Sequence, residues 1–445
     1  MMNEKDKTLR TEHSSFSTNN SSLKVPAIRF KGFSGAWEER TLGEVGELKN
    51  GMNFSKEAMG HGYPFVNLQD VFGKNVVSNN GLGFAVSTAT QRKDYSLQKG
   101  DVLFIRSSVK PEGVGEAAVI YKNFENTTYS GFIIRFRPKL EMAVNFSRFI
   151  YSITYIRKQI LASATSSANT NINQESLQKI QLALPEFFEQ TKIGNYFQQL
   201  DTLISQHQQK HDKLLNLKKS LLEKMFPKQG KDEPEIRFKG FSGAWEEKEF
   251  SDTFANIPNN TLSRAELNYD FGLSKNVHYG DVLIKFGEVL DIKKEIIPFI
   301  TNNNFTHKLK STKLHDGDVI IADAAEDKTV GKCTELVNIG EEIIFSGLHT
   351  IAVRPVLPFS SKYLGYYMNS FAYHDQLLFL MQGTKVLSIS KSAIQNTSIN
   401  FPNCTKEQTK IGKLFKTLDT LLTQHQSQLK KLKQIKQACL AKMFV

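Results

Sequence analysis

The chain carries an internal duplication. Residues 28–39 and 236–247 both read IRFKGFSGAWEE. Further along, residues 189–226 and 407–444 agree at 21 of 38 positions, and both begin Glu-Gln-Thr-Lys-Ile-Gly. Agreement of this length does not arise by chance, so the chain must fold as two related halves. Each half has a globular block followed by a helix, and the helices are more alike than the blocks.

The two globular blocks share only short matches. Gly100-Asp101-Val102 aligns with Gly317-Asp318-Val319, Ser130-Gly131 with Ser346-Gly347, and Arg137-Pro138 with Arg354-Pro355. Runs rich in β-branched residues predict strands at 101–108, 116–121, 131–138, 281–286, 318–323 and 348–355. Helical spacing predicts helices over 144–162 and around 361–381. The fold class is therefore α/β or α+β.

The repeated helices carry the hydrophobic spacing of a coiled coil. Apolar residues recur at alternating intervals of four and three, which predicts that the two helices pack on each other. Equivalent seam positions hold His207 and His425, which suit a metal pair, a pH switch or, in our interpretation, a polar layer that fixes register. The predicted packing residues are Ile193, Phe197, Leu200, Ile204, His207, Leu214, Leu221, Ile411, Phe415, Leu418, Leu422, His425, Leu432 and Met443.

Both helices also have local signals near their first turn. Thr405 and Gln408 have the spacing of a capping box. Gly194 and Gly412 lie one turn in, where glycine costs about 1 kcal/mol relative to alanine. Either a close helix approach or a frayed first turn accounts for them.

The charge balance favours a polyanionic partner. The net charge is +12, and the excess lies in the first block and the last helix, whereas the second block is nearly neutral. Such a balance is typical of nucleic-acid binding, although basic proteins without that function also exist.

Two polar loops in each block are candidate DNA contacts. The strand after Gly100 ends in a basic, hydroxyl-bearing loop, and its counterpart ends in acids. Arg pairs with guanine and Asp accepts from cytosine, so the two blocks would read different sequences. The runs 163–173 and 382–385 carry hydroxyls and amides suited to base and phosphate contacts, and ordinary solvated loops are the alternative. The candidates are Arg106, Ser107, Ser108, Lys110, Ser166, Asn169, Asn171, Asp323, Asp327, Lys328, Gln382, Thr384 and Lys385.

Motifs of catalysis are not found. The sequence has no P-loop, nucleotide-binding glycine loop, HExxH, zinc-type cysteine pair or nucleophile elbow. We therefore expect no catalytic residue and no metal or cofactor bound by this chain. The polar residues 1–25 predict a disordered tail, and no apolar run is long enough for a membrane span, which predicts a cytoplasmic protein.

This arrangement resembles the specificity subunits of type I restriction–modification enzymes. The resemblance begins at about residue 26 and rests on the two variable blocks, the RFKGFSGAWEE leaders, the helices containing Leu-Asp-Thr-Leu, the Gly-Asp-Val strands and the segment SGLHTIAVRP around His349. It implies two target-recognition domains separated by two long helices packed as an antiparallel coiled coil, a pseudo-two-fold duplication, and a bipartite asymmetric site in double-stranded DNA.

The resemblance also implies partners. Two modification subunits would carry S-adenosylmethionine and methylate adenine, and restriction subunits would use ATP and Mg²⁺ to translocate and cleave DNA. This chain would itself be non-catalytic. The expected segments are the tail (1–25), a first recognition domain (26–188), a spacer helix (189–226), a linker (227–235), a second recognition domain (236–406) and a second spacer helix (407–445).

Two other functions remain open. A coiled-coil scaffold with protein-binding blocks would lack steep, salt-dependent binding to duplex DNA. A solitary DNA-modifying or DNA-cutting enzyme would bind its cofactor without any partner.

Overall fold

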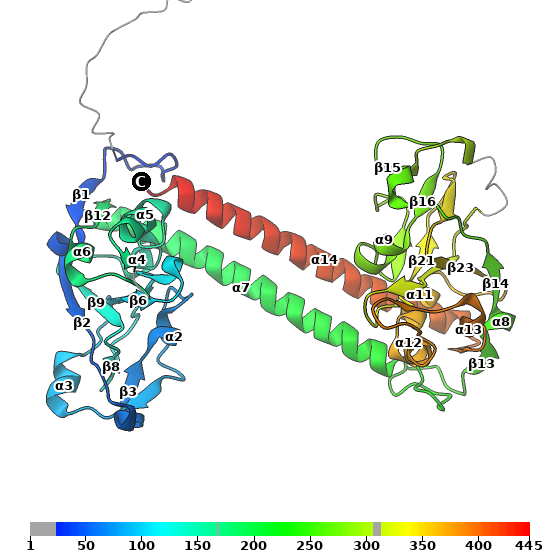
Figure 1. Cartoon of the computed structure of the whole chain (residues 1–445), viewed down its shortest axis with the longest axis horizontal. Helices are drawn as coiled ribbons and strands as arrows, with labels where there is room; N and C mark the ends of the chain where they lie inside the picture. Colours follow the sequence, from blue (N-terminus) through cyan, green and yellow to red (C-terminus); the bar gives the residue numbers. More distant parts are fainter. Residues whose placement is uncertain (1–23, 167–168, 306–312) are drawn as a thin grey trace, which may run out of the picture. The chain divides into compact units, whose positions relative to one another are not determined.

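The chain forms two compact units, which the computed structural model describes over residues 24–166, 169–305 and 313–445 (Figure 1). Unit 1 comprises Met1–Ser205 and Lys430–Val445, and unit 2 comprises Gln206–Leu429. Most of the predicted N-terminal tail, residues 1–23, lies outside the described residues. Each unit thus takes part of both long helices.

A four-stranded antiparallel sheet forms the centre of unit 1, in the order β2-β9-β5-β7. Val102 and Phe104 of β5 face one apolar core, and Leu103 and Ile105 face another, so both sides of the strand are covered. Double burial explains the continuous apolar run that predicted this strand. The strands are β2 (Gly46–Asn50), β9 (Ile133–Pro138), β5 (Val102–Ile105) and β7 (Ala117–Val119).

Smaller elements complete unit 1. A second sheet has the order β4-β3-β8, and β1 pairs with β12. The predicted helix over 144–162 is in fact two helices, α4 (Val144–Ile150) and α5 (Thr154–Ala162), because the chain turns at Tyr151–Ile153. Other elements of unit 1 are β1 (Glu38–Thr41), α1 (Leu42–Val45), η1 (Lys56–Ala58), β3 (Met59–Val66), α2 (Leu68–Val71), β4 (Gly83–Ala85), α3 (Ala89–Asp94), η2 (Pro111–Gly113), β8 (Thr128–Tyr129), α6 (Gln174–Gln178) and β12 (Gln181–Leu184).

Unit 2 is built around a five-stranded sheet in the order β14-β23-β19-β21-β17. The unit also has a four-stranded sheet in the order β15-β18-β16-β22, and β13 pairs with β25. These strands are β13 (Glu246–Glu249), β14 (Phe254–Ile257), β15 (Leu267–Asn268), β16 (Lys275–Val277), β17 (Val289–Asp291), β18 (Phe299–Ile300), β19 (Val319–Ala322), β21 (Cys333–Val337), β22 (Ile344–Ser346), β23 (Thr350–Pro355) and β25 (Ser398–Phe401).

Two sequence-based expectations fail in unit 2. The strand predicted at 281–286 is wrong, because the segment forms α9 (Tyr279–Ile284), whose start is capped by the His278 ring accepting from the amide of Gly280. The helix predicted around 361–381 is broken between Met368 and Phe371 into two. The helices and turns of this unit are α8 (Phe250–Thr253), η3 (Arg264–Glu266), α9, α11 (Tyr363–Met368), α12 (Phe371–Leu378) and α13 (Lys391–Ile394).

The short matches between the blocks have a structural cause. In unit 1 the Arg137 guanidinium donates to both carboxylate oxygens of buried Asp101, at 2.7 Å each. In unit 2 Arg354 contacts Asp318 in the same way, at 2.8 and 2.7 Å. Both pairs join neighbouring strands of the central sheet, so the Gly-Asp-Val and Arg-Pro segments form the same two-point ion pair twice.

The two long helices run antiparallel within each unit. They are α7 (Phe187–Lys224) and α14 (Thr405–Lys442), each beginning two residues before its predicted start. In unit 1 the rings of Phe197 and Phe444 lie 5.7 Å apart, and in unit 2 those of Phe226 and Phe415 lie 5.9 Å apart. All the predicted seam residues are buried or half-buried, as residues of a packed seam are expected to be.

The first turn of each helix packs on its globular block. A Cβ on Gly194 would lie 2.4 Å from the backbone nitrogen of Phe146, so the glycine allows a close approach, made to the start of α4 and not to the other long helix. The predicted capping box is wrong. The Gln408 side chain donates to the Pro402 carbonyl and accepts from the Ser360 amide, so it anchors the helix to unit 2.

Candidate nucleic-acid interface

The structure brings the two candidate loops of unit 1 together. Strand β6 (Ser107–Ser108) pairs with β11 (Thr170–Asn171), which in turn pairs with β10 (Thr165–Ser166). The amide of Ile172 also donates to the carbonyl of Arg106 at 2.9 Å. Two polar segments that are more than fifty residues apart in the sequence therefore form one small sheet, called here the unit 1 edge.

Unit 2 repeats this arrangement. Strand β20 (Ala324–Ala325) pairs with β24 (Leu387–Ser388), and Gln382 and Ser388 exchange backbone hydrogen bonds of 2.9 and 2.8 Å. The amide of Ile389 donates to the carbonyl of Asp323 at 2.8 Å. Both candidate loops of the second block therefore also meet, in the unit 2 edge.

Most of the predicted contact residues lie at the surface of these edges. Arg106, Ser107, Asn171 and Asp323 are half-buried. Ser108 is buried, so its hydroxyl is poorly placed to reach a DNA base. The backbone of Ser166 belongs to β10. The exposed members are Lys110, Asn169, Asp327, Lys328, Gln382, Thr384 and Lys385.

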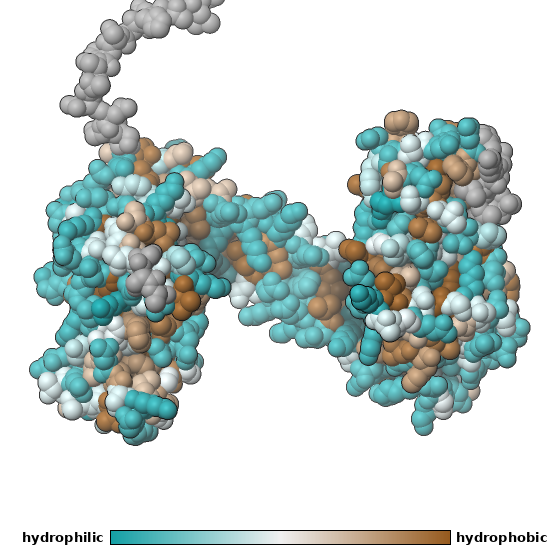
Figure 2. All heavy atoms as spheres, viewed as in Figure 1, coloured by the Kyte–Doolittle hydropathy of each residue, from teal (hydrophilic) through white to brown (hydrophobic). Residues whose placement is uncertain are grey.

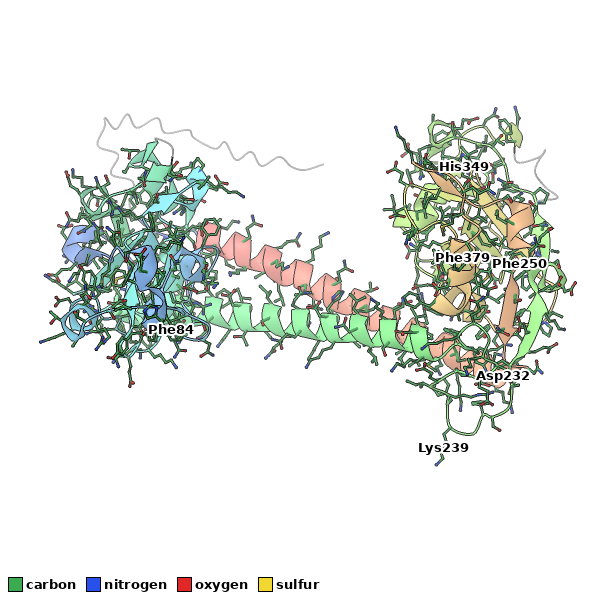
Figure 3. All side chains as sticks on the ribbon, turned by 60° about the horizontal axis from the view of Figure 1, so that its bottom comes forward. Phe84, Asp232, Lys239, Phe250, His349 and Phe379 are labelled. Carbon is green, nitrogen blue, oxygen red and sulfur yellow. The ribbon has the colours of Figure 1, made fainter. Side chains whose placement is uncertain are left out.

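Two residues at these edges were missed by the sequence analysis as candidate contacts. The amide of Arg106 donates to the carbonyl of Phe132, and that of Asp323 donates to the carbonyl of His349. Phe132 is 55% exposed and the side chain of His349 is 52% exposed. Figure 3 labels His349 in unit 2. They occupy equivalent places, but the second block has one extra residue after its Ser-Gly match, which hides the equivalence in the sequence.

The unit 1 edge is bordered by exposed apolar side chains. Val109 is 83% exposed and Phe72 is 45% exposed, and a Cβ on Gly113 would touch both Phe72 and the Ser108 hydroxyl. Figure 2 shows apolar atoms at the surface of this part of unit 1, over the segments labelled α2 and β3 in Figure 1. Apolar side chains of this kind can contact the methyl group of thymine.

The unit 2 edge differs in its electrostatics. Burial raises the pKa of Asp323, while nearby His349 and Lys391 act in the opposite direction. The His349 Nδ1 atom lies 3.2 Å from the Asp323 carboxylate, which it can hold in place. Asp327 accepts hydrogen bonds from the amide and hydroxyl of Thr329, and these lower its pKa. Unit 2 thus presents acceptors where unit 1 presents a guanidinium and a lysine.

Over the described ranges, no three His, Cys, Asp or Glu side chains gather as a metal site needs. Within those same ranges, helices both long and apolar enough to span a bilayer are absent. His207 and His425 meet only as a pair, with their Nδ1 atoms 2.9 Å apart.

The chain is similar in fold to solved structures. The S subunit of a type I restriction–modification system from M. genitalium has 16% identity and a TM-score of 0.51, covering 94% of this chain and 99% of that one. The HsdS subunit from Thermoanaerobacter tengcongensis has 17% identity and a TM-score of 0.45, covering 92% and 96%. No curated protein matches the chain.

At these identities the likeness to solved structures shows the fold alone, whereas a match to a family model shows the family. The model described as "Type I restriction modification DNA specificity domain" matches residues 35–216 and 276–434, which is more than half of the chain. The two matched segments contain both edges and most of both long helices. The chain therefore belongs to the family of type I restriction–modification DNA specificity subunits.

Proposed function

We propose that this chain recognises a bipartite, asymmetric site in double-stranded DNA, with one half read at each edge. The observation that carries the proposal is the pair of equivalent edges with different chemistry. Arg106 stands where Asp323 stands in unit 2, and Phe132 stands where His349 does. Duplicated scaffolds with different side chains at the same place suit two different half-sites, because base identity is read by donors, acceptors and apolar groups.

The repeated segments supply the second part of the proposal, which is docking to two modification subunits. Each leader is tied to its helix by a two-point ion pair, Arg29 with Glu189 and Arg237 with Glu407. Lys31 and Lys239 at the leader tips are exposed in both copies. Two nearly identical surfaces in one chain fit two copies of one partner.

The partner subunits would then carry out the catalysis. Modification subunits would bind S-adenosylmethionine and methylate adenine, and restriction subunits would use ATP and Mg²⁺. The chain's own residues would position the DNA and the partner subunits. The assembly would act in the cytoplasm, where the DNA is.

The test is co-expression with the modification subunit encoded beside this chain, followed by sequencing of methylated adenines in the host DNA. We expect a complex with two modification subunits per chain and a methylated motif split by an unread gap. Unchanged methylation on deletion of this chain would contradict the proposal. A scaffold would show partner binding without any motif.

A further inference from the structure

A cationic pocket lies within unit 1, beside the unit 1 edge. It has a volume of about 700 Å³. Its wall combines the loop after α2, the start of β7, the turn between α4 and α5 with residues of both these helices, and residues of both long helices. The charged lining residues are Lys74, Arg148, Arg157 and Lys436, with Glu116 and Asp201 as the acids.

The acids do not balance the cations. Asp201 is shared between Arg148 at 3.0 Å and Lys436 at 2.6 Å. Glu116 accepts a hydrogen bond from the amide of Gly73 at 2.7 Å. The pocket therefore keeps an excess of positive charge.

Several donors in the wall have no partner within the described part of the chain. They are the Arg157 Nη1, the Arg148 Nε and the hydroxyl of Tyr151. Tyr151 is only 3% exposed. Burial lowers the pKa of Arg157, and only Glu116 acts against that effect. Buried donors are normally satisfied, so the wall behind the pocket holds positive charge and donors that the chain's own acceptors do not use.

The equivalent guanidinium is missing from unit 2. Arg157 Nη2 donates to the carbonyl of Val114 at 2.8 Å, and His374 Nε2 lies 2.8 Å from the carbonyl of Val330. The two side chains therefore occupy the same place. Unit 2 has an imidazole where unit 1 has a second guanidinium in the pocket.

An acid also appears in unit 2 at the same wall. The carbonyl of Asn75 accepts from the amide of Val119, and the carbonyl of Glu288 accepts from the amide of Glu335. Glu288 therefore replaces Asn75, and its carboxylate is 2.7 Å from Lys218 Nζ. The excess of positive charge is a property of unit 1, so the internal repeat does not require it for folding.

The pocket is joined to the unit 1 edge. Arg157 Nη2 also donates to the carbonyl of Glu112 at 2.7 Å. Glu112 lies in η2, which begins directly after the candidate residue Lys110. A duplex whose bases face the edge would therefore bring its backbone close to the pocket.

We propose that this pocket binds phosphate oxygens, namely those of the DNA backbone beside the half-site read by unit 1. The proposal rests on the proposed function for its source of phosphate. Guanidinium and ammonium groups that converge on one cavity match the several oxygens of a phosphate. The affinity for the first half-site would then fall more steeply with salt concentration than the affinity for the second half-site.

The test compares Lys74→Gln with Lys158→Gln in the full chain. Both lysines are exposed and both belong to unit 1, but only Lys74 lines the pocket. Affinity for a duplex carrying the methylated motif is measured against salt concentration. Loss of one phosphate contact lowers the slope of log K against log salt by about 0.9. We expect that loss in Lys74→Gln and an unchanged slope in Lys158→Gln.

A second arm identifies the source of the phosphate. Line broadening of inorganic phosphate is followed by ³¹P NMR with the wild-type chain and both variants. Broadening lost in Lys74→Gln with an unchanged DNA slope would assign the pocket to free phosphate. If the two variants have the same salt slope and the same ³¹P line broadening, the proposal that the pocket binds phosphate is overturned. If no methylated motif exists, the proposed function fails, and the inorganic phosphate arm still decides the pocket.

Discussion

The Nδ1 atoms of His207 and His425 lie 2.9 Å apart, on α7 and α14 of unit 2. The two residues are equivalent in the repeat, being 218 positions apart. At that distance one ring can donate a proton only if the other is neutral and accepts it. The hydrogen bond between the two Nδ1 atoms therefore joins the two helices, and it needs one Nδ1 with a proton and one without. Its predicted role in fixing helix register stays a prediction.

This contact makes helix pairing sensitive to acid. Burial lowers the pKa of His425 most, followed by the positive charges of His207, Lys210 and His211. A lowered pKa in the folded state means that the unfolded chain binds the proton first as the pH falls. Stability should therefore be intact above the usual histidine pKa of about 6.5 and fall below it. Urea unfolding between pH 8 and pH 5.5 measures this decline.

A glutamine variant tests whether His425, and not other groups that titrate in acid, causes the fall in stability. His425→Gln should flatten the decline, whereas His61→Gln, at an exposed position of unit 1, should leave it unchanged. An equal decline in wild type and His425→Gln would rule out the histidine pair as its cause.

Gly194 and Gly412 are equivalent in sequence but should respond differently to alanine. The new Cβ would lie 2.4 Å from the Phe146 nitrogen in unit 1, but 3.1 Å from the nearest atom of Lys362 in unit 2. Gly194→Ala should cost about 2 kcal/mol by overpacking. Gly412→Ala should be close to neutral, because a helix-propensity gain of about 1 kcal/mol offsets a milder contact. Thermal unfolding of both variants is the check, and equal melting temperatures would contradict it.

The Arg29–Glu189 ion pair should stabilise the packing of the first RFKGFSGAWEE leader on its helix. The Glu189 side chain is fully enclosed, and its two oxygens each accept from Arg29 at 2.7 Å. Arg29→Met would leave a buried carboxylate without its partner, at a cost of about 3 kcal/mol. Chemical denaturation of Arg29→Met measures it, with exposed Lys31→Met as the matched control. The double variant Arg29→Met with Glu189→Met should recover most of the loss.

Removing one edge residue should affect one half-site only. If Arg106 reads a base, Arg106→Ala should reduce the discrimination against wrong bases in its own half-site by about 1–3 kcal/mol. Asp323→Asn should act on the other half-site. Methylation of duplexes altered in one half at a time measures both, with exposed Lys122→Ala as a control for lost charge. A uniform weakening across all sequences would instead identify Arg106 as a phosphate contact.

The repeated framework can be predicted from the amino-acid sequence alone. The repeated segments placed the helices within two residues of their observed starts, and the four-and-three spacing within them predicted seam residues that are buried or half-buried. The matched Gly-Asp-Val and Arg-Pro segments pointed to the equivalent strands. These features are local, because a helix face or a buried strand is set by residues that are neighbours along the chain.

The make-up of the two edges and of the pocket depends on tertiary contacts. Only the pairing of β6 with β11 shows that two distant polar loops form one edge, and only the cross-strand contact shows that Phe132 and His349 are equivalent. Tertiary context also overrode local preference at 281–286, where a β-rich run became α9. The pocket joins Lys74, Arg157 and Lys436. Contacts between such distant residues depend on strand register and helix packing, which no local pattern encodes.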